Sequence, residues 1–255
     1  GEVMAIGRKF EEALQKAIRM LDLGRHGICC NDIHFENLEE ELKNPTDERI
    51  FAVAQAVNKE WSIERIYELT KIDKWFLHKI KNIFDVKNKL SGNFSKESVL
   101  EAKKYGFSDK QISLITNTLK KDILSFRHEN NIFPFIKKID TLAAEYPAQT
   151  NYLYTTYNSV EDDVKISHEN LILILGSGTY RIGSSVEFDW CCVNCIKTLK
   201  KMGYKTSVLN YNPETVSTDY DESDFLFFDE ISYENVYEIC KKINPLGVVF
   251  SVGGQ

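Results

Sequence analysis

Apolar residues recur at helical spacing through the first half of the chain. A repeat of three or four residues places them on one face of a helix. The first such stripe consists of Phe10, Ala13, Leu14, Ala17, Ile18 and Leu21. Gly24 is placed to end this helix. Residues 23–46 are polar and contain Gly24, Gly27 and Pro45, which predicts a connecting loop.

Further helices are predicted between residues 47 and 130. Helical stripes recur over residues 47–57, 62–69 and 71–90. Ser108 and Gln111 then match a capping box, directly after Gly106 has ended the preceding helix. The stretch from about residue 10 to 130 is therefore predicted to form an all-helical unit.

Residues 131–168 show no clear period. Pro134 and Pro147 interrupt the pattern, and the aromatic segment with Tyr152, Tyr154 and Tyr157 follows neither template. Because a loose linker would leave these apolar and aromatic side chains in water, we expect an ordered bridge that packs on both neighbours.

From Leu171 onward, short apolar runs alternate with helical patterns. Strands are predicted at 171–175, 206–210, 225–228 and 248–252, and helices over 184–202 and 232–243. This alternation is typical of a parallel sheet with helices on its faces. The fold class predicted for the chain is α + α/β, in which an all-helical domain precedes a parallel sheet flanked by helices.

A glycine loop with Gly176, Gly178 and Gly183 follows the first predicted strand. Glycine lets the main chain approach a ligand closely, and the start of the next helix carries partial positive charge, so an anion is the expected ligand. A tight turn without a ligand is the alternative. Arg181 favours the anion site, because a guanidinium beside backbone donors suits phosphate or carboxylate.

A second polar loop, residues 212–219, begins with Asn212 after the second strand. Both loops should lie at the carboxyl ends of parallel strands, where neighbouring loops share a ligand. Glu187 and Glu214 would then repel each other unless Arg181 or a solvated ligand lies between them. The simpler interpretation, slightly favoured by the residues alone, makes Glu187 a helix-start residue and Glu214 a solvated loop charge.

Two other site types fit the residues poorly. An NAD site is disfavoured because the third glycine comes too late for GxGxxG and the second strand ends in Asn210, which is not acidic. Cys191, Cys192 and Cys195 lack the second ligand pair of a zinc site, so no metal is predicted there. His168 belongs to no recognisable nucleophile arrangement.

Charge and cysteine usage narrow the function classes. A net charge of −6 and a pI near 5.5 argue against nucleic-acid binding. The sequence shows no secretory leader and no apolar span of about 18 residues, so we expect no membrane segment, reduced thiols and a cytoplasmic location. Because the chain opens on Gly1 and stops just after an apolar run, it is expected to be a fragment.

Six segments carry a resemblance to a known family. They are residues 1–8, 72–77, 106–111, 140–145, 181–189 (RIGSSVEFD) and 212–219 (NPETVSTD). In this order they resemble the large, synthetase part of carbamoyl-phosphate synthetase over essentially the whole chain. The sequences of the two loops are most similar to those of the eukaryotic glutamine-dependent form that begins pyrimidine synthesis.

The resemblance implies a domain plan and site roles. Residues 1–20 would end the first ATP-grasp half, 21–160 would form the helical oligomerisation domain with its bridge, and 161–255 the Rossmann-like pre-ATP-grasp subdomain. The family makes carbamoyl phosphate from bicarbonate, glutamine-derived ammonia and two ATP, and carbamate travels through an internal tunnel. Positions matching Arg181, Glu187, Asn212 and Glu214 would lie at the second active site or along that passage.

The resemblance also implies cofactors and partners. ATP and Mg would be bound mainly outside this chain, which alone is expected to bind neither and to be inactive. Expected partners are the remaining ATP-grasp subdomains, a glutaminase subunit or domain, a second copy of the chain, and fused aspartate transcarbamoylase and dihydroorotase domains. The alternative function is a non-catalytic module for oligomerisation or allosteric communication.

Overall fold

The structure, a computed structural model, describes residues 2–166, 169–183 and 185–250. The chain divides into two compact units. The helical unit comprises Lys9–Arg19 and Leu23–Ile132, and the sheet unit comprises Phe133 onward together with Met20–Asp22 and the segment up to Arg8. The predicted α + α/β fold class is confirmed.

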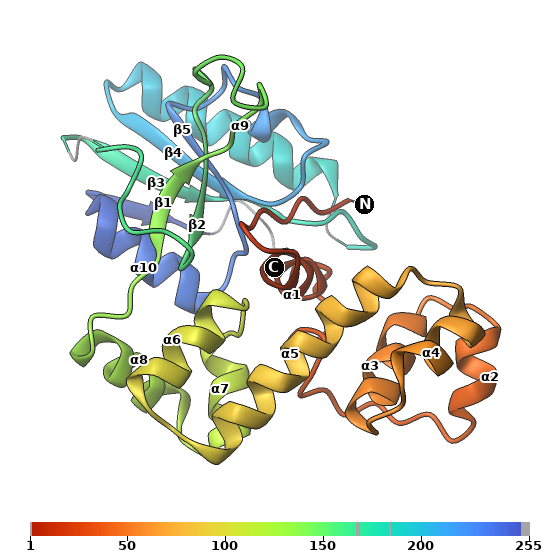
Figure 1. The fold of residues 1–255 in the computed structure, drawn as a ribbon. Coiled ribbons are helices and arrows are strands. Elements are labelled where there is room, and N and C mark those ends of the chain that lie inside the picture. Colours follow the sequence, from red (N-terminus) through yellow and green to blue (C-terminus); the bar gives the residue numbers. More distant parts are fainter. Residues whose placement is uncertain (1, 167–168, 184, 251–255) are drawn as a thin grey trace. The chain divides into compact units, whose positions relative to one another are not determined.

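The helical unit (Figure 1) contains the predicted helices, with bounds close to those expected from the apolar stripes. Its elements are α1 (Phe10–Met20), α2 (Leu38–Lys43), α3 (Arg49–Asn58), α4 (Ile63–Thr70), α5 (Lys74–Gly92), α6 (Lys96–Lys104), α7 (Asp109–Thr116) and α8 (Lys120–Glu129). The capping box predicted at Ser108 and Gln111 is confirmed.

The short helix α2 corrects the prediction of a loop over residues 23–46. Asn37 caps it by accepting a hydrogen bond from the Glu40 amide at 3.3 Å. Leu38 and Leu42 lie four residues apart and are both buried. Two apolar residues are too few to show a period in the sequence, and packing supplies the stability that the pattern does not reveal.

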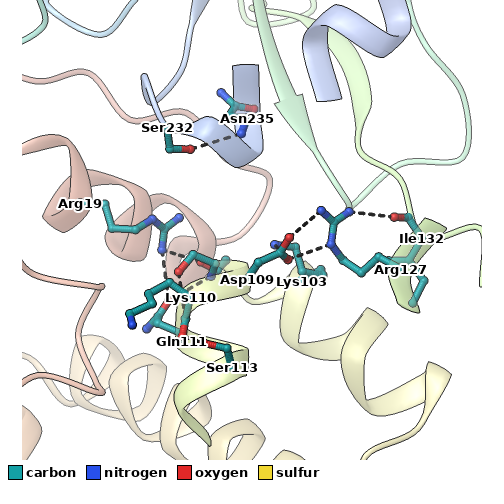
Figure 2. Close-up of polar contacts among 12 residues, drawn as sticks. Arg19, Lys103, Asp109, Lys110, Gln111, Ser113, Arg127, Ile132, Ser232 and Asn235 are labelled. Atoms are coloured by element: carbon teal, nitrogen blue, oxygen red, sulfur yellow. Dashed lines mark hydrogen bonds and ion pairs between the residues drawn. The ribbon is translucent and has the colours of Figure 1, made fainter. Parts of the chain in front are cut away.

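A buried ion-pair cluster holds α8 against the start of α7 (Figure 2). The Nε and Nη2 atoms of Arg127 each donate to an oxygen of the Asp109 carboxylate at 2.8 Å, and Nη1 donates to the Ile132 carbonyl at 3.1 Å. Lys103 Nζ lies 3.3 Å from Asp109 Oδ1. The pKa of the Asp109 carboxyl lies below its ordinary value. Burial is the largest single influence and would raise this pKa, but the positive charges and hydrogen bonds of Lys103 and Arg127 together outweigh it.

The sheet unit is built on six strands in the order β1-β2-β5-β4-β3-β6. They are β1 (Phe135–Lys138), β2 (Tyr152–Thr156), β3 (Leu171–Leu175), β4 (Lys205–Asn210), β5 (Phe225–Phe228) and β6 (Gly247–Val249). Only the β1–β2 pair is antiparallel. The order places β3 between β4 and β6, which is the arrangement of a Rossmann half.

Strands β1 and β2 come from the stretch without a clear period. β2 pairs with β5, and four of its five residues are buried. A strand covered on both faces loses the alternation that marks a strand exposed on one side, which explains why the aromatic segment followed no template.

The two faces of the sheet carry separate apolar cores. Leu171 and Leu173 of β3 pack with Ile239 and Ile243 of α10 (Tyr233–Ile243). The alternate β3 residues pack instead against Cys192 and Ile196 of α9 (Val186–Lys201). Helices α9 and α10 therefore cover opposite faces (Figure 1), as the β-α-β pattern predicts. Within the described residues, no helix has the length and apolar character needed to cross a membrane.

Candidate functional site

The two candidate loops leave neighbouring strands at one edge of the sheet. β3 and β4 are parallel, and Leu175 pairs with Leu209 at their carboxyl ends. The glycine loop begins at Gly176 directly after β3, and the second loop begins at Tyr211 directly after β4. The structure thus brings the loops together where the parallel topology requires.

Asn210, the last residue of β4, links the two loops through its side-chain amide. Its Oδ1 accepts hydrogen bonds from the amides of Gly178 at 3.0 Å, Tyr211 at 2.8 Å and Asn212 at 3.4 Å. Its Nδ2 donates to Ser217 Oγ at 3.3 Å. The side chain is fully buried. One amide group therefore sets the distance between the glycine loop and the second loop.

The glycines of the first loop are required by close packing. A Cβ on Gly176 would lie 2.6 Å from Cγ of Asn210, and a Cβ on Gly178 would lie 2.4 Å from the Tyr211 hydroxyl. Gly178 also has φ +69°, which disfavours other residues. The amides of Gly176 and Gly178 donate to the Leu209 carbonyl and to Asn210, so they shape the loop and are already satisfied within the protein.

Arg181 forms an ion pair with Asp22, in the short segment Met20–Asp22 of the sheet unit. Beside it, Thr179 Oγ1 donates to the Met20 carbonyl at 3.0 Å. Side-chain exposures of 36% for Arg181 and 53% for Asp22 leave this pair in contact with solvent, so its net contribution is below about 1 kcal/mol. The guanidinium therefore lies at the partly exposed edge of the loop.

The second loop is shaped by Asn212. Its Oδ1 accepts a hydrogen bond from the Glu214 amide at 3.0 Å, and its carbonyl accepts one from Thr218 Oγ1 at 3.0 Å. Asn212 is buried, whereas Glu214 is exposed. The Asn212 side chain thus stabilises a local turn, and the Glu214 side chain on this turn faces solvent.

Glu187 lies in the first turn of α9 and is exposed. Its carboxylate accepts a hydrogen bond from the Ser185 hydroxyl at 2.6 Å, which lowers the pKa of Glu187. A carboxylate at this position also interacts favourably with the helix dipole. Gly183, the remaining candidate of the loop, is exposed with φ +85°.

Asp189 and Tyr180 are site residues that the sequence analysis missed. Asp189 is buried, its Oδ2 accepts a hydrogen bond from the Ser217 amide at 3.2 Å, and its Oδ1 has no hydrogen-bond partner among the described residues. The Tyr180 hydroxyl is hydrogen-bonded to Thr215 Oγ1, which joins the two loops a second time. The sequence signal for Asp189 was an acidic residue in the first turn of a predicted helix. Asn210 was also missed as a site residue, and its signal was a polar residue at the end of a buried strand.

Burial makes Cys192 and Cys195 of α9 poor nucleophiles. Burial raises the pKa of Cys192 to about 12, and it also raises the pKa of Cys195. Across residues 2–166, 169–183 and 185–250, no three His, Cys, Asp or Glu side chains gather as a metal site. His168 lies outside the described residues.

Two family models match the chain. The large-chain oligomerisation domain of carbamoyl-phosphate synthetase matches residues 2–131, and the preATP-grasp domain of carbamoyl phosphate synthase matches residues 168–255. Together they cover the helical unit and most of the sheet unit.

Curated relatives align with the whole chain. A protein of Squalus acanthias named multifunctional protein CAD is 53% identical, over 12% of its own length. The mitochondrial arginine-specific large chain of carbamoyl phosphate synthase from Neurospora crassa is 52% identical, over 22% of its length. The multifunctional protein pyr1-3 of Dictyostelium discoideum is 51% identical, over 12% of its length. The chain belongs to the carbamoyl-phosphate synthetase large-chain family.

Proposed function

We propose that the chain is part of a glutamine-dependent carbamoyl-phosphate synthetase and forms one wall of its second active site and carbamate passage. The reaction would join bicarbonate, glutamine-derived ammonia and two ATP into carbamoyl phosphate. The observation that carries the proposal is the Asn210 link, which keeps the loop with Arg181 beside the loop with Glu214. The helical unit would connect the two synthetase halves.

The charges of the loops suit a small anion. Arg181 would attract the negative carbamate, while the exposed carboxylates of Glu187 and Glu214 keep the surroundings polar and hydrated. Along a polar, hydrated passage the carbamate would be bound weakly enough to move to the next site. The proposed contribution of the two loops is to bind and guide the carbamate.

ATP and Mg would be held mainly by other parts of the enzyme. The amides of Gly176 and Gly178 already donate within the protein, so they do not fit a phosphate-binding role. Because these two amides are already occupied, we propose that the nucleotide contacts come from other parts of the enzyme.

The relatives do not decide between the pyrimidine-type and the arginine-type enzyme. Identities of 53% to a multifunctional protein and 52% to an arginine-specific chain do not separate the two types. We propose the multifunctional, pyrimidine-type enzyme with fused aspartate transcarbamoylase and dihydroorotase, in the cytoplasm. This choice is based on the sequences of the two loops, which resemble those of the pyrimidine-type enzyme.

Arg181→Ala in the intact enzyme is expected to lower carbamoyl-phosphate formation by about 10²-fold to 10³-fold, the usual cost of removing one group that stabilises a reacting anion. Glutamine hydrolysis should persist, because its chemistry lies outside this chain. A coupled assay for carbamoyl phosphate and a glutamate assay measure the two rates. Glu187→Ala should likewise lower synthesis selectively.

Two controls accompany these variants. Asp22→Asn removes the ion-pair partner of Arg181 but leaves the guanidinium, so synthesis should stay near the unsubstituted rate. Lys197→Ala removes an exposed charge elsewhere on α9. Unchanged synthesis in Arg181→Ala would remove this residue from the proposed mechanism.

Oligomerisation is a second candidate function, favoured by the match of residues 2–131 to an oligomerisation domain. The helical unit also exposes Trp75 and Phe76, which contact Phe10 in edge-on or tilted geometry at ring-centroid distances of 5.4 and 5.3 Å and each other at 5.0 Å. Exposed aromatic patches of this kind commonly mark interaction surfaces. We expect a dimer of about twice the 29.4 kDa chain mass in size-exclusion chromatography with light scattering. A strict monomer at all concentrations would contradict this role.

A further inference from the structure

A cavity of about 200 Å³ lies in the helical unit, outside the site described above. One wall is the segment 28–33, which follows α1. The other walls come from α3 through Phe51 and Ala54, and from α5 through Phe84 and Lys87. The adjacent residues Cys29 and Cys30 both line it.

The segment that carries the two cysteines is held at both ends. On the N-terminal side of the cysteines, His26 and Gly27 are held by the Asn31 side chain. This side chain accepts a hydrogen bond from the His26 amide at 2.9 Å and donates one to the Gly27 carbonyl at 2.7 Å. After them, the Gln55 side chain bonds to the amide and carbonyl of Phe35 at 2.9 and 3.0 Å. The cysteines therefore keep a defined geometry at the cavity.

The two sulfur atoms lie side by side. Cys30 Sγ is 3.7 Å from Cys29 Sγ, and Cys30 has φ +66°. A left-handed conformation is uncommon for a residue with a side chain, and here it accompanies the close approach of neighbouring thiols. Cys29 is buried, with Gln111 Nε2 at 3.4 Å from its sulfur, whereas Cys30 is partly exposed.

The surroundings make Cys30 the more reactive thiol. Its pKa is lowered, chiefly by hydrogen bonding with the Cys29 thiol and further by the positive charge of Lys87, and these outweigh the effect of burial. Hydrogen bonding with Cys30, followed by burial, raises the pKa of Cys29. The thiolate is the nucleophilic form of cysteine, so the accessible member of the pair is also the better nucleophile.

We propose that Cys29 and Cys30 form a redox-active thiol pair, in which a hydroperoxide that enters the cavity oxidises Cys30 and Cys29 resolves the product to a disulfide between adjacent residues. The Cys30 thiolate attacks one peroxide oxygen; the S–O bond forms, the O–O bond breaks, and the leaving oxygen takes a proton to become water or an alcohol. The Cys29 sulfur then attacks Cys30; the S–S bond forms, the S–O bond breaks, and water leaves with the Cys29 proton. The two sulfurs lose two electrons, which the peroxide gains.

The other thiols serve as internal controls. Cys191 is exposed on α9, whereas burial raises the pKa of Cys192, Cys195 and Cys240. Cys191 and Cys192 are also adjacent in sequence. If adjacency or exposure alone were sufficient, they would oxidise as readily as the cavity pair.

The experiment treats the reduced full chain with limiting hydrogen peroxide, alkylates the remaining thiols and measures tryptic peptides by mass. Peptide 26–43 contains only Cys29 and Cys30, and peptide 182–197 contains the three α9 thiols. Peptide 26–43 should lose about 2 Da, escape alkylation and recover on reduction. It should do so at least about 10-fold faster than peptide 182–197 oxidises.

Two conservative variants separate the roles. Cys30→Ser should leave Cys29 reduced, and Cys29→Ser should leave Cys30 as a sulfenic acid that dimedone traps. The proposal is overturned if peptide 26–43 of the unsubstituted chain keeps two alkylated thiols while peptide 182–197 oxidises. Oxidation of Cys29 at an unchanged rate in Cys30→Ser would also overturn it. The unsubstituted chain supplies the first result, so it does not depend on how the variants fold.

Discussion

Arg127→Met is expected to destabilise the helical unit by about 3–5 kcal/mol, the usual result of removing one partner from a buried ion pair. Arg127 is fully buried, and it donates twice to the Asp109 carboxylate and once to the Ile132 carbonyl. Methionine fills part of the volume but carries no charge. Of the two cations in the cluster, the Asp109 carboxylate then keeps only Lys103, whose Nζ lies 3.3 Å away. The loss is therefore chiefly the desolvation of a partly compensated charge.

Urea unfolding followed by tryptophan fluorescence measures this change. Trp61 and Trp75 lie in the helical unit and Trp190 in the sheet unit, so a Trp190→Phe background reports the helical unit alone. Lys81→Met is the matched control, because Lys81 and Asp85 form an exposed i,i+4 pair. It should cost no more than about 0.5 kcal/mol. A loss below about 1 kcal/mol in Arg127→Met would show that the cluster contributes little.

The pH dependence gives this prediction a second readout. In the unsubstituted chain the pKa of Asp109 is lowered, so its stabilising contribution is present above the unfolded pKa of about 3.9 and is lost as the pH falls through the lower folded value. Without Arg127, burial should raise the pKa of Asp109. The variant then recovers stability as the carboxyl protonates, and the difference between the two proteins should narrow from pH 7 to pH 4.

Asn210→Ala in the intact enzyme is expected to lower carbamoyl-phosphate formation by about 10²-fold, an effect that rests on the proposed function. The substitution removes the common acceptor of the Gly178, Tyr211 and Asn212 amides. Each buried amide left without a partner costs about 1–3 kcal/mol, so the loops should move to find other partners. A displacement of about 1 Å at a reacting centre is enough for the expected loss.

Matched variants test the link itself. Asn210→Asp keeps the acceptor oxygen and should lose less synthesis than Asn210→Ala. Ser217→Ala removes the 3.3 Å bond to Nδ2 and a hydrogen bond with Cys192 but keeps the acceptor of the loop amides, so it should have a small effect. Glutamine hydrolysis and Trp190 fluorescence report whether the enzyme and the sheet unit remain folded. Full synthesis in a folded Asn210→Ala enzyme would show that the loops do not need this amide.

The apolar pattern was sufficient to predict most helices and the strands from Leu171 onward. These elements have strong periods, or they are buried runs bounded by Gly and Pro. Parallel topology then placed the glycine loop beside the second loop, because strands that run in one direction end at one edge. The short helix α2 and strand β2 were not predicted. The first has too few apolar residues to show a period, and the second is covered on both faces.

The sequence by itself determined the two-part architecture, the family and the loops that carry the candidate chemistry, because these depend on local periodicity and on contiguous motifs. Only the tertiary structure decided how the loops are joined. It revealed the Asn210 link, the pairing of Arg181 with Asp22 and the internal use of the glycine amides. Each of these is a contact between residues distant in sequence or a hydrogen bond whose geometry follows from packing, and no local pattern encodes such partners.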